Sequence, residues 1–188
     1  EILRCLVGSE MCIRDRNWRV IHDDIANISC LDLEDYFGIK KGELDLLSGG
    51  APCQAFSYAG KRLGLEDARG TLFYHYATFL QKLQPKMFLF ENVRGLLTHD
   101  KGRTYATITN IFEQAGYTIQ KKVLNAWDFG VPQKRERIII VGFIDDVEFS
   151  FPEPISESEK TTLADILEDN VDKKYYVPVS YTHLTLPT

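Results

Sequence analysis

The sequence predicts an α/β fold built on a mainly parallel sheet, and two observations predict it. Between residues 17 and 178, short apolar runs of strand length alternate with longer stretches in which apolar residues recur every three to four positions. This alternation is typical of βαβ units. The second observation is composition: 188 residues that are 44% hydrophobic and 26% charged suit one globular domain with a hydrophobic core.

The first half of the pattern gives a strand, a helix and a strand. Residues 44–47 predict a short strand that runs into a tight loop at 48–50. Residues 71–83 carry apolar side chains at helical spacing, and this helix stops before Pro85. Residues 86–90 form a continuous apolar run, as expected for a strand that is buried on both faces.

The second half gives a helix and two strands. Residues 105–115 predict an amphipathic helix that closes at Gly116, because glycine commonly ends helices. Residues 120–124 and 138–143 predict two strands that flank a loop at 125–137.

Four segments of different origin are expected along the chain. Residues 17–150 read as a partial catalytic domain, and 151–178, which are rich in proline and acidic residues, as a linker with a short helix near 163–167. Residues 1–16 and 179–188 lack periodicity, caps and turn signals, so we expect both ends to be non-native.

A coding relation between the two ends supports this expectation. Residues 11–15 can be encoded as ATG TGT ATA AGA GAC, and the reverse complement of that string translates as residues 179–183. The ends therefore resemble translated adapter DNA, and Cys5 and Cys12 are expected to have no role.

Composition and charge exclude several classes. The formal net charge of −5 gives no overall basic surface for nucleic acid. The four cysteines stand at unrelated spacings, which suggests neither a zinc site nor a disulfide framework, and no metal is expected. No apolar run approaches the roughly 20 residues that cross a bilayer. We expect a cytoplasmic monomer with no membrane association.

Polar groups follow the predicted strands at three places. In an open α/β sheet, ligands bind beyond the carboxyl ends of the strands. The first strand leads to Cys53 and Gln54, the next ends at Glu91 and Asn92, and the late loop holds the string QKRER. Taken singly, these are ordinary features: a buried small cysteine, a solvated carboxylate and a charged surface loop. Together they would supply the thiol, carboxylate and guanidinium groups that nucleophilic attack on a heterocycle requires.

Four ordered strings make the pattern specific. GGAPCQAFS, RGTLF, ENV and QKRER followed by IIIVGF resemble, in order and spacing, the blocks of bacterial DNA cytosine carbon-5 methyltransferases. The resemblance implies a Rossmann-like fold that uses S-adenosylmethionine, and it covers most of residues 24–143.

The resemblance also implies roles for the catalytic residues. Cys53 matches the thiol that adds to carbon 6 of a flipped-out cytosine, which activates carbon 5 for methylation. Glu91 matches the residue that protonates or hydrogen-bonds ring nitrogen 3. Arg137 matches the side chain that holds the exocyclic carbonyl oxygen, and Arg135 matches its companion, which supports the thiolate.

Binding residues follow from the same resemblance. The cofactor residues would be Asp24, which would contact adenine, together with Pro52 and Leu72. Contacts to DNA or to the target base would come from Gln54, Ser57, Asn92 and Gln133. The implied partners are double-stranded DNA and, through the restriction-modification context, a cognate endonuclease.

The resemblance is incomplete. The glycine-rich cofactor loop should precede Asp24, and a domain that reads the DNA sequence should follow Tyr176, so we expect the fold to be incomplete at its N-terminus and this polypeptide to have little or no activity. The alternatives are an RNA cytosine methyltransferase, a non-catalytic homologue of the same fold, and an unrelated α/β module in which Cys53 is merely buried.

Overall fold

The structure is a computed structural model that describes residue 21 and residues 23–29, 31–52 and 71–168. The chain divides into two compact units. The first comprises Glu1–Leu124 and Glu136–Pro152, and the second comprises Asn125–Arg135 and Glu153–Thr188.

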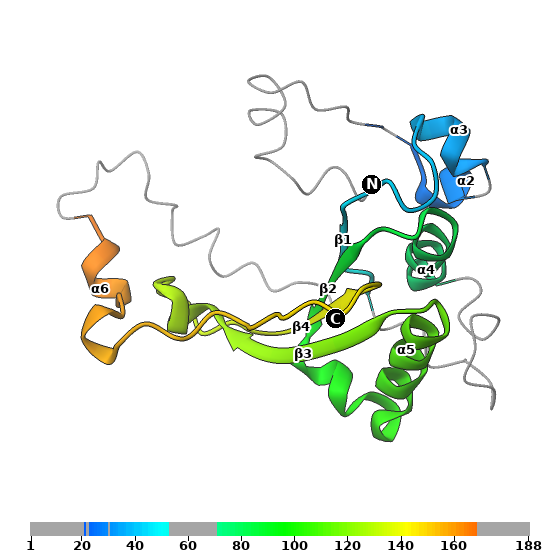
Figure 1. Cartoon of the computed structure of the whole chain (residues 1–188). Coiled ribbons are helices and arrows are strands. Elements are labelled where there is room, and N and C mark those ends of the chain that lie inside the picture. The colour runs from blue at the N-terminus through cyan, green and yellow to red at the C-terminus, as the bar shows by residue number, and fades with distance from the viewer. Residues whose placement is uncertain (1–20, 22, 30, 53–70, 169–188) are drawn as a thin grey trace, which may run out of the picture. The chain divides into compact units, whose positions relative to one another are not determined.

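A four-stranded sheet forms the centre of the first unit (Figure 1). Its strands lie in the order β1-β2-β4-β3. Strand β1 pairs with β2 in parallel, whereas β2 pairs with β4 antiparallel. The bounds are β1 Leu46–Gly49, β2 Met87–Val93, β3 Thr118–Asn125 and β4 Glu136–Phe143. The α/β class is therefore confirmed, but the described part of the sheet is mixed where a mainly parallel one was expected.

Two long helices cover one face of this sheet. Helix α4 spans Leu72–Leu83, and the Thr71 hydroxyl caps it by accepting a hydrogen bond from the Tyr74 amide. Helix α5 spans Arg103–Gln114, and the chain leaves it through Gly116, whose φ of 94° suits glycine. Both helices lie where apolar spacing predicted them.

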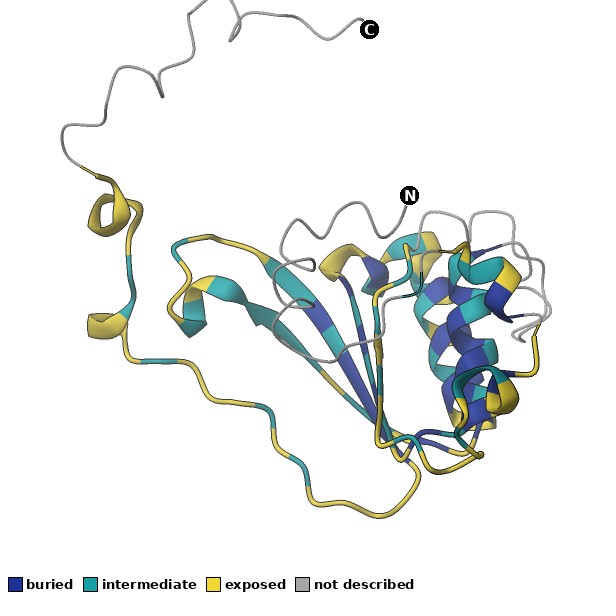
Figure 2. Ribbon diagram, turned by 90° about the horizontal axis from the view of Figure 1, so that it is seen from above, coloured by how far each residue is buried: buried dark blue, intermediate teal, exposed yellow. Residues whose placement is uncertain are grey.

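One apolar cluster joins these helices to the sheet. Most of its buried members come from α4, α5, β2 and β4, and they include Phe73, Leu80, Phe88, Phe90, Ile108, Phe112, Ile138 and Ile140. Figure 2 shows the buried faces of α4 and α5 turned toward the strands. Burial of these aromatic and aliphatic side chains, each of the kind that contributes roughly 1.5–3 kcal/mol, fixes the sheet on its helical layer.

Strand β2 is not equally buried on its two faces. Phe88, Phe90 and Asn92 are buried. Met87, Leu89 and Glu91, which alternate with them along the strand, are only half-buried. The expectation of a strand buried on both faces was therefore wrong for this strand: alternate side chains point away from α4 and α5.

Two short helices pack beside α4. They are α2 (Ile25–Ser29) and α3 (Leu33–Phe37), and the sequence analysis did not predict either. Asp32 caps α3 at its start, and Gly38, with a φ of 69°, ends it. A second apolar cluster, built on Ile28, Leu33, Phe79 and Leu83, joins the two short helices to α4.

The second unit contains only short elements in its described part. A 3₁₀ turn, η6, covers Ala126–Phe129, a second one, η7, covers Glu157–Glu159, and helix α6 covers Leu163–Ile166. The short helix expected near 163–167 is therefore present.

Two features are absent from the described residues. None of their helices has the length and apolar character needed to cross a bilayer. Nor do the described side chains include three or more His, Cys, Asp or Glu residues arranged to hold a metal ion.

Candidate active site

The structure describes the backbone that leads to the predicted nucleophile, and the nucleophile itself lies outside the described residues. Cys53, Gln54 and Ser57 lie outside the described residues, which resume at Thr71. The backbone that leads to Cys53 is described as far as Pro52.

Parallel pairing brings the ends of β1 and β2 together. Gly49 stands opposite Phe90 in the register, and the next residue, Gly50, lies against Glu91. A Cβ atom placed on Gly50 would lie 2.9 Å from Glu91 Oε2 and 3.1 Å from the Glu91 carbonyl oxygen. The Glu91 carboxylate can approach this backbone because residue 50 has no side chain.

Antiparallel pairing brings Arg137 to the same edge. Val93 stands opposite Arg137, so the start of β4, rather than its end, meets the carboxyl end of β2. Arg137 Nε lies 2.7 Å from Glu91 Oε1, and its Nη1 donates to the Glu136 carbonyl oxygen at 2.9 Å. The side chains of Arg137 and Glu91 are 25% and 40% exposed, so both are accessible to a ligand. The structure thus unites two of the four predicted catalytic residues.

Asn92 fixes the segment before Cys53. Its side chain is buried, and Nδ2 donates to the Ala51 carbonyl oxygen at 2.7 Å. Its Oδ1 accepts a hydrogen bond from the Val93 amide at 2.9 Å. The side-chain amide of Asn92 therefore holds the end of β2 to the backbone of Ala51, one residue before Pro52.

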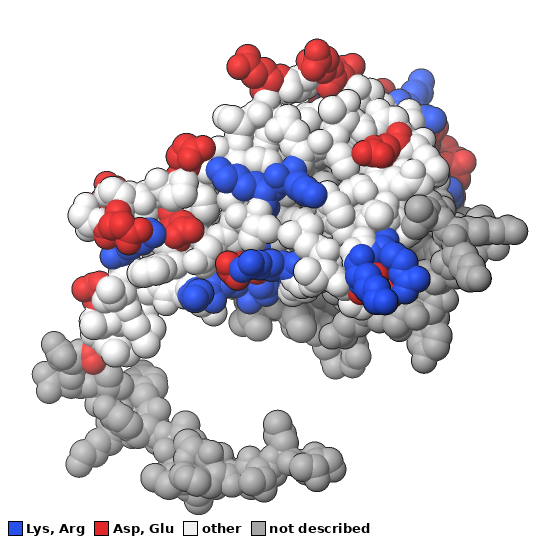
Figure 3. Space-filling view, turned by 90° about the horizontal axis from the view of Figure 1, so that it is seen from below, with Lys and Arg blue, Asp and Glu red and all other residues white. Residues whose placement is uncertain are grey.

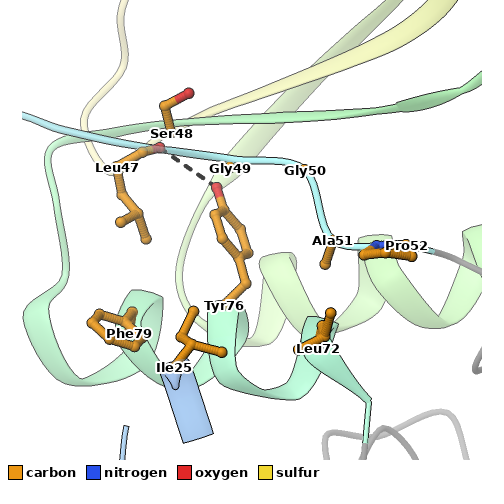
Figure 4. Close-up of a pocket in the computed structure, with 10 residues that line it drawn as sticks. All are labelled: Ile25, Leu47, Ser48, Gly49, Gly50, Ala51, Pro52, Leu72, Tyr76 and Phe79. Atoms are coloured by element: carbon orange, nitrogen blue, oxygen red, sulfur yellow. Dashed lines mark hydrogen bonds between the residues drawn. The ribbon is translucent and has the colours of Figure 1, made fainter. Parts of the chain in front are cut away.

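An apolar cavity of about 370 Å³ opens beside the same segment (Figure 4). The backbone from Leu47 to Pro52 forms one wall, and side chains from α2 and α4 form the other. The lining side chains from these helices are Ile25, Leu72, Tyr76 and Phe79. Gly50 and Ala51 border both this cavity and the groups around Glu91 and Asn92.

Tyr76 forms part of the cavity wall, and its hydroxyl contacts the backbones of both β1 and β2. Its hydroxyl donates toward the carbonyl oxygens of Leu89 at 3.2 Å and Leu47 at 3.5 Å. Burial, with a smaller contribution from Tyr117, raises the pKa of Tyr76 far above its usual range, so the phenol stays a neutral donor. The ring fills the space beside Gly49, where a Cβ atom would lie 2.8 Å from it.

Of the three predicted cofactor residues, two line the cavity. Pro52 and Leu72 do so directly. Asp24 precedes the lining residue Ile25, and its Oδ1 accepts a hydrogen bond from the Ala26 amide at 2.8 Å, which satisfies an amide at the start of α2.

The cavity fits the apolar part of S-adenosylmethionine. Its volume is within the range of small-molecule sites, and the described lining consists of apolar side chains, a serine, a tyrosine and glycine backbone. A flat heterocycle suits such a wall. Among the described lining residues there is no charged side chain to pair with the amino-acid end of the cofactor.

Arg135 and Gln133 belong to the second unit. Both are exposed residues of the loop between β3 and β4. The Arg135 amide donates to Asn125 Oδ1 at 3.0 Å, and the Arg135 carbonyl oxygen accepts from the Ala126 amide at 3.0 Å. These bonds close the base of the loop.

Sequence reasoning missed several residues of the site. Ile25, Tyr76 and Phe79 line the cavity. In the sequence, Tyr76 and Phe79 read only as apolar positions of a helix, and no helix was predicted at Ile25. Arg94 was also missed: its Nη1 contacts both Glu136 oxygens at 2.9 and 3.0 Å, which adds a second charged link between the end of β2 and the start of β4. In the sequence, the acidic residue among the basic residues of QKRER was the feature that could have indicated an ion pair with Glu136.

Charge on the described surface is mixed. On the face shown in Figure 3, Lys and Arg side chains form separate groups with Asp and Glu side chains between them. This agrees with the small net charge of the sequence.

Comparison with protein families and curated proteins gives a consistent result. The family model for C-5 cytosine-specific DNA methylase matches residues 14–184. The chain is 50% identical over 149 residues to the type II methyltransferase M.NgoBI of Neisseria gonorrhoeae, which covers 79% of this chain and 44% of that protein. It is 48% identical over 156 residues to the type II methyltransferase M.HaeII of Haemophilus aegyptius, covering 82% and 46%. The chain spans less than half the length of these curated relatives.

Solved structures show the same fold. The Entamoeba histolytica methyltransferase EhMeth matches with a TM-score of 0.57 at 17% identity, over 91% of this chain and 52% of that one. The S. pombe Dnmt2 methyltransferase matches with a TM-score of 0.57 at 21% identity, over 87% and 51%. The Rossmann-like methyltransferase fold expected from the sequence is thereby confirmed.

Proposed function

Because the chain belongs to the C-5 cytosine-specific DNA methylase family, we propose that the protein transfers a methyl group from S-adenosylmethionine to carbon 5 of a cytosine in double-stranded DNA. The observation that carries this proposal is the Glu91–Arg137 pair, which stands against Gly50, three residues before Cys53.

The proposed chemistry begins with the thiolate of Cys53, which adds to carbon 6 of a cytosine rotated out of the duplex. Electron density then moves to carbon 5. Glu91 donates a proton or hydrogen bond to ring nitrogen 3, and Arg137 holds the exocyclic carbonyl oxygen as charge develops. Carbon 5 would then take the methyl group, with the thioether S-adenosylhomocysteine as the leaving group. Transfer of the carbon-5 proton to a base, expulsion of the thiolate from carbon 6 and return of any proton on ring nitrogen 3 to Glu91 then restore the aromatic ring.

The cofactor would occupy the apolar cavity. Pro52 and Leu72 would hold its adenosine part, with Asp24 near the adenine edge and Ile25 and Phe79 as further apolar contacts. When bound, S-adenosylmethionine supplies an electrophilic methyl group on a sulfonium centre. Since Gly50 and Ala51 border both the cavity and the groups around Glu91, cofactor and base would meet across this segment.

Asn92 is proposed to position the nucleophile loop. Its buried hydrogen bond to Ala51 fixes the backbone just before Pro52 and Cys53. Gln54, Ser57 and Gln133 stay candidates for contacts to DNA, and Arg135 for support of the thiolate.

The biological setting follows from the relatives. Two similar proteins are named type II methyltransferases, so we propose that a cognate restriction endonuclease acts on the same DNA site. We further propose that the protein works as a monomer in the cytoplasm.

Covalent trapping tests the proposal. The complete protein that contains this chain is incubated with cofactor and duplex DNA containing 5-fluorocytosine, whose fluorine blocks the final loss of a proton from carbon 5. A covalent protein–DNA adduct is expected, and Cys53→Ser should abolish it. Cys30→Ser, at a cysteine to which the resemblance gives no role, should leave the adduct intact.

Two outcomes would contradict the proposal. One is an adduct that persists in Cys53→Ser; the other is methyl transfer from labelled cofactor to structured RNA but not to duplex DNA. The 188-residue chain alone is expected to give little or no methyl transfer, and robust turnover by it would contradict that expectation.

A further inference from the structure

We propose that Lys160 is a positioning residue for the methyl transfer, because it fixes the loop that carries Arg135. The inference rests on the proposed function, since the orientation of Arg135 matters only if that side chain supports the reaction. It concerns the second unit alone, in which residues 153–162 fold back on residues 125–135.

Lys160 is unusually enclosed for a lysine. Its side chain is only 9% exposed, and Nζ lies 2.9 Å from Asp128 Oδ1. It also donates to the Glu157 carboxylate and lies 4.8 Å from the centre of the Trp127 ring. Hydrogen bonds to Glu157 and Asp128 raise the pKa of this ammonium group, so it is charged at neutral pH. Lysine is seldom buried unless it is paired, and here it has two carboxylates and an aromatic face.

Two further contacts hold the same two segments together. The Ile155 amide donates to the Asp128 carbonyl oxygen at 2.9 Å. Trp127 Nε1 donates to the Thr161 carbonyl oxygen at 3.3 Å. Lys160 thus stands within an interface rather than in an isolated surface pair.

A short path leads from Lys160 to Arg135. Lys160 contacts Trp127 and Asp128, which belong to the 3₁₀ turn η6. Asn125 caps that turn, and its Oδ1 accepts hydrogen bonds from both the Trp127 amide at 3.4 Å and the Arg135 amide at 3.0 Å. One oxygen atom therefore joins the turn that Lys160 holds to the backbone of Arg135.

This path would influence function because Arg135 is exposed. A side chain without its own packing takes its direction from the backbone that carries it. If the turn loosens, the guanidinium group of Arg135 becomes less well oriented, and small errors in the position of a catalytic group reduce rate strongly.

Limited proteolysis tests the structural part on the 188-residue chain. Trypsin cleavage of the 134–135 and 135–136 peptide bonds is followed by mass spectrometry. Lys160→Met, which retains an unbranched apolar side chain but removes the charge, should be cleaved there roughly tenfold faster than the unaltered chain, as expected when local opening becomes easier. Lys160→Arg should restore slow cleavage, and Asp128→Asn, which removes the partner charge, should also accelerate cleavage. Lys41→Met, at an exposed lysine of the first unit, is the matched control.

Steady-state kinetics test the functional part in the complete protein. Lys160→Met should lower kcat roughly tenfold while KM for duplex DNA changes little, and Lys160→Arg should recover most of the rate. A purely structural role would instead lower the amount of active protein, which titration with 5-fluorocytosine duplex measures, and would leave kcat per active site unchanged.

The outcomes separate the two proposals. Unchanged cleavage in both Lys160→Met and Asp128→Asn would overturn the inference, as would an unaltered kcat per active site. If the unaltered complete protein forms no adduct and transfers no methyl group, the proposed function fails, while the proteolysis result still shows whether Lys160 holds the loop.

Discussion

Glu91 is the residue on which the proposed chemistry depends most. Its carboxylate pairs with Arg137 at 2.7 Å and is 40% exposed, so it has an ion-pair partner and a side that a base can approach. A carboxyl group can donate a proton in this position, whereas the amide of glutamine can only donate a hydrogen bond.

Glu91→Gln is therefore expected to lower kcat for DNA methylation by roughly 100-fold or more, the usual size of a lost general acid. Labelled methyl transfer by the complete protein measures this change. Glu113→Gln, at an exposed position of α5, serves as the control and should keep the unaltered rate. A Glu91→Gln variant with normal kcat would remove Glu91 from the mechanism.

Gly49 is constrained by the cavity wall. A methyl group there would lie 2.8 Å from the buried Tyr76 ring, so the ring or the strand must move. Gly49→Ala should lower the free energy of unfolding by about 1–3 kcal/mol, as overpacking does. Urea unfolding measures it, with Gly95→Ala as control because nothing lies within 4 Å of that position. Equal free energies of unfolding for the two variants would show that the Tyr76 ring moves aside without loss of stability.

Helix α4 is the element that serves both the core and the cavity. Leu72, Tyr76 and Phe79 face the cavity, while Phe73 and Leu80 belong to the main apolar cluster. One helix can do both because residues 72, 76 and 79 share one face, while residues 73 and 80, each one position further along, lie on the adjacent face.

The start of α4 depends on Thr71, whose side chain caps the first turn. Thr71→Ala should lower the free energy of unfolding by about 1 kcal/mol, because the Tyr74 amide loses its acceptor. Thr71→Ser keeps a hydroxyl and should restore most of that stability. Denaturant titration distinguishes the variants, and identical midpoints for Ala and Ser would mean that the cap contributes nothing.

At the scale of the whole molecule, buried phenols link stability to pH. Burial raises the pKa of Tyr117 above its ordinary value of 10.0, and its hydroxyl donates to the Pro85 carbonyl oxygen at 2.8 Å. As pH rises, the unfolded chain therefore loses this proton before the folded chain does. The contribution of Tyr117 protonation to the free energy of unfolding is therefore fully present below pH 10 and declines above it.

The free energy of unfolding should accordingly fall between pH 10 and 11 by up to about 1.4 kcal/mol for each such tyrosine. Tyr117→Phe is less stable at neutral pH by about 1 kcal/mol, because it lacks the hydrogen bond, but its stability should decline less steeply over the same interval. Urea unfolding at a series of pH values checks both. Parallel curves for the two proteins would contradict the assignment to Tyr117.

The sequence predicted the elements with a strong period and missed what depends on contacts between distant segments. Helices α4 and α5 were found because each repeats its apolar positions over several turns. Helix α3, with five residues, is too short for that signal, although Asp32 and Gly38 mark its ends. The direction of β4 was not predicted, since apolar runs carry no information about strand orientation.

The candidate site was predicted in the same uneven way. Glu91 and Arg137 were expected to converge because the family strings identify them, and they lie 2.7 Å apart. The carboxyl ends of the strands do not explain this contact, since Arg137 stands at the start of the antiparallel strand β4. The lining residues Ile25 and Tyr76 could not be told from ordinary core positions, since their place in a cavity depends on how α2 and α4 pack. The position of Cys53 stays a prediction.

Because β4 runs antiparallel to β2, the contacts at this edge depend on which side chains of β4 point to each face of the sheet. Side chains alternate between the two faces, so Arg137 contacts Glu91 while its neighbour Glu136 reaches Arg94. Deleting one residue inside β4 would exchange these two side chains and set a carboxylate against Glu91. Insertions or deletions that leave the proposed catalytic contacts intact must therefore lie in the loop before β4. Within the strand, they must add or remove an even number of residues.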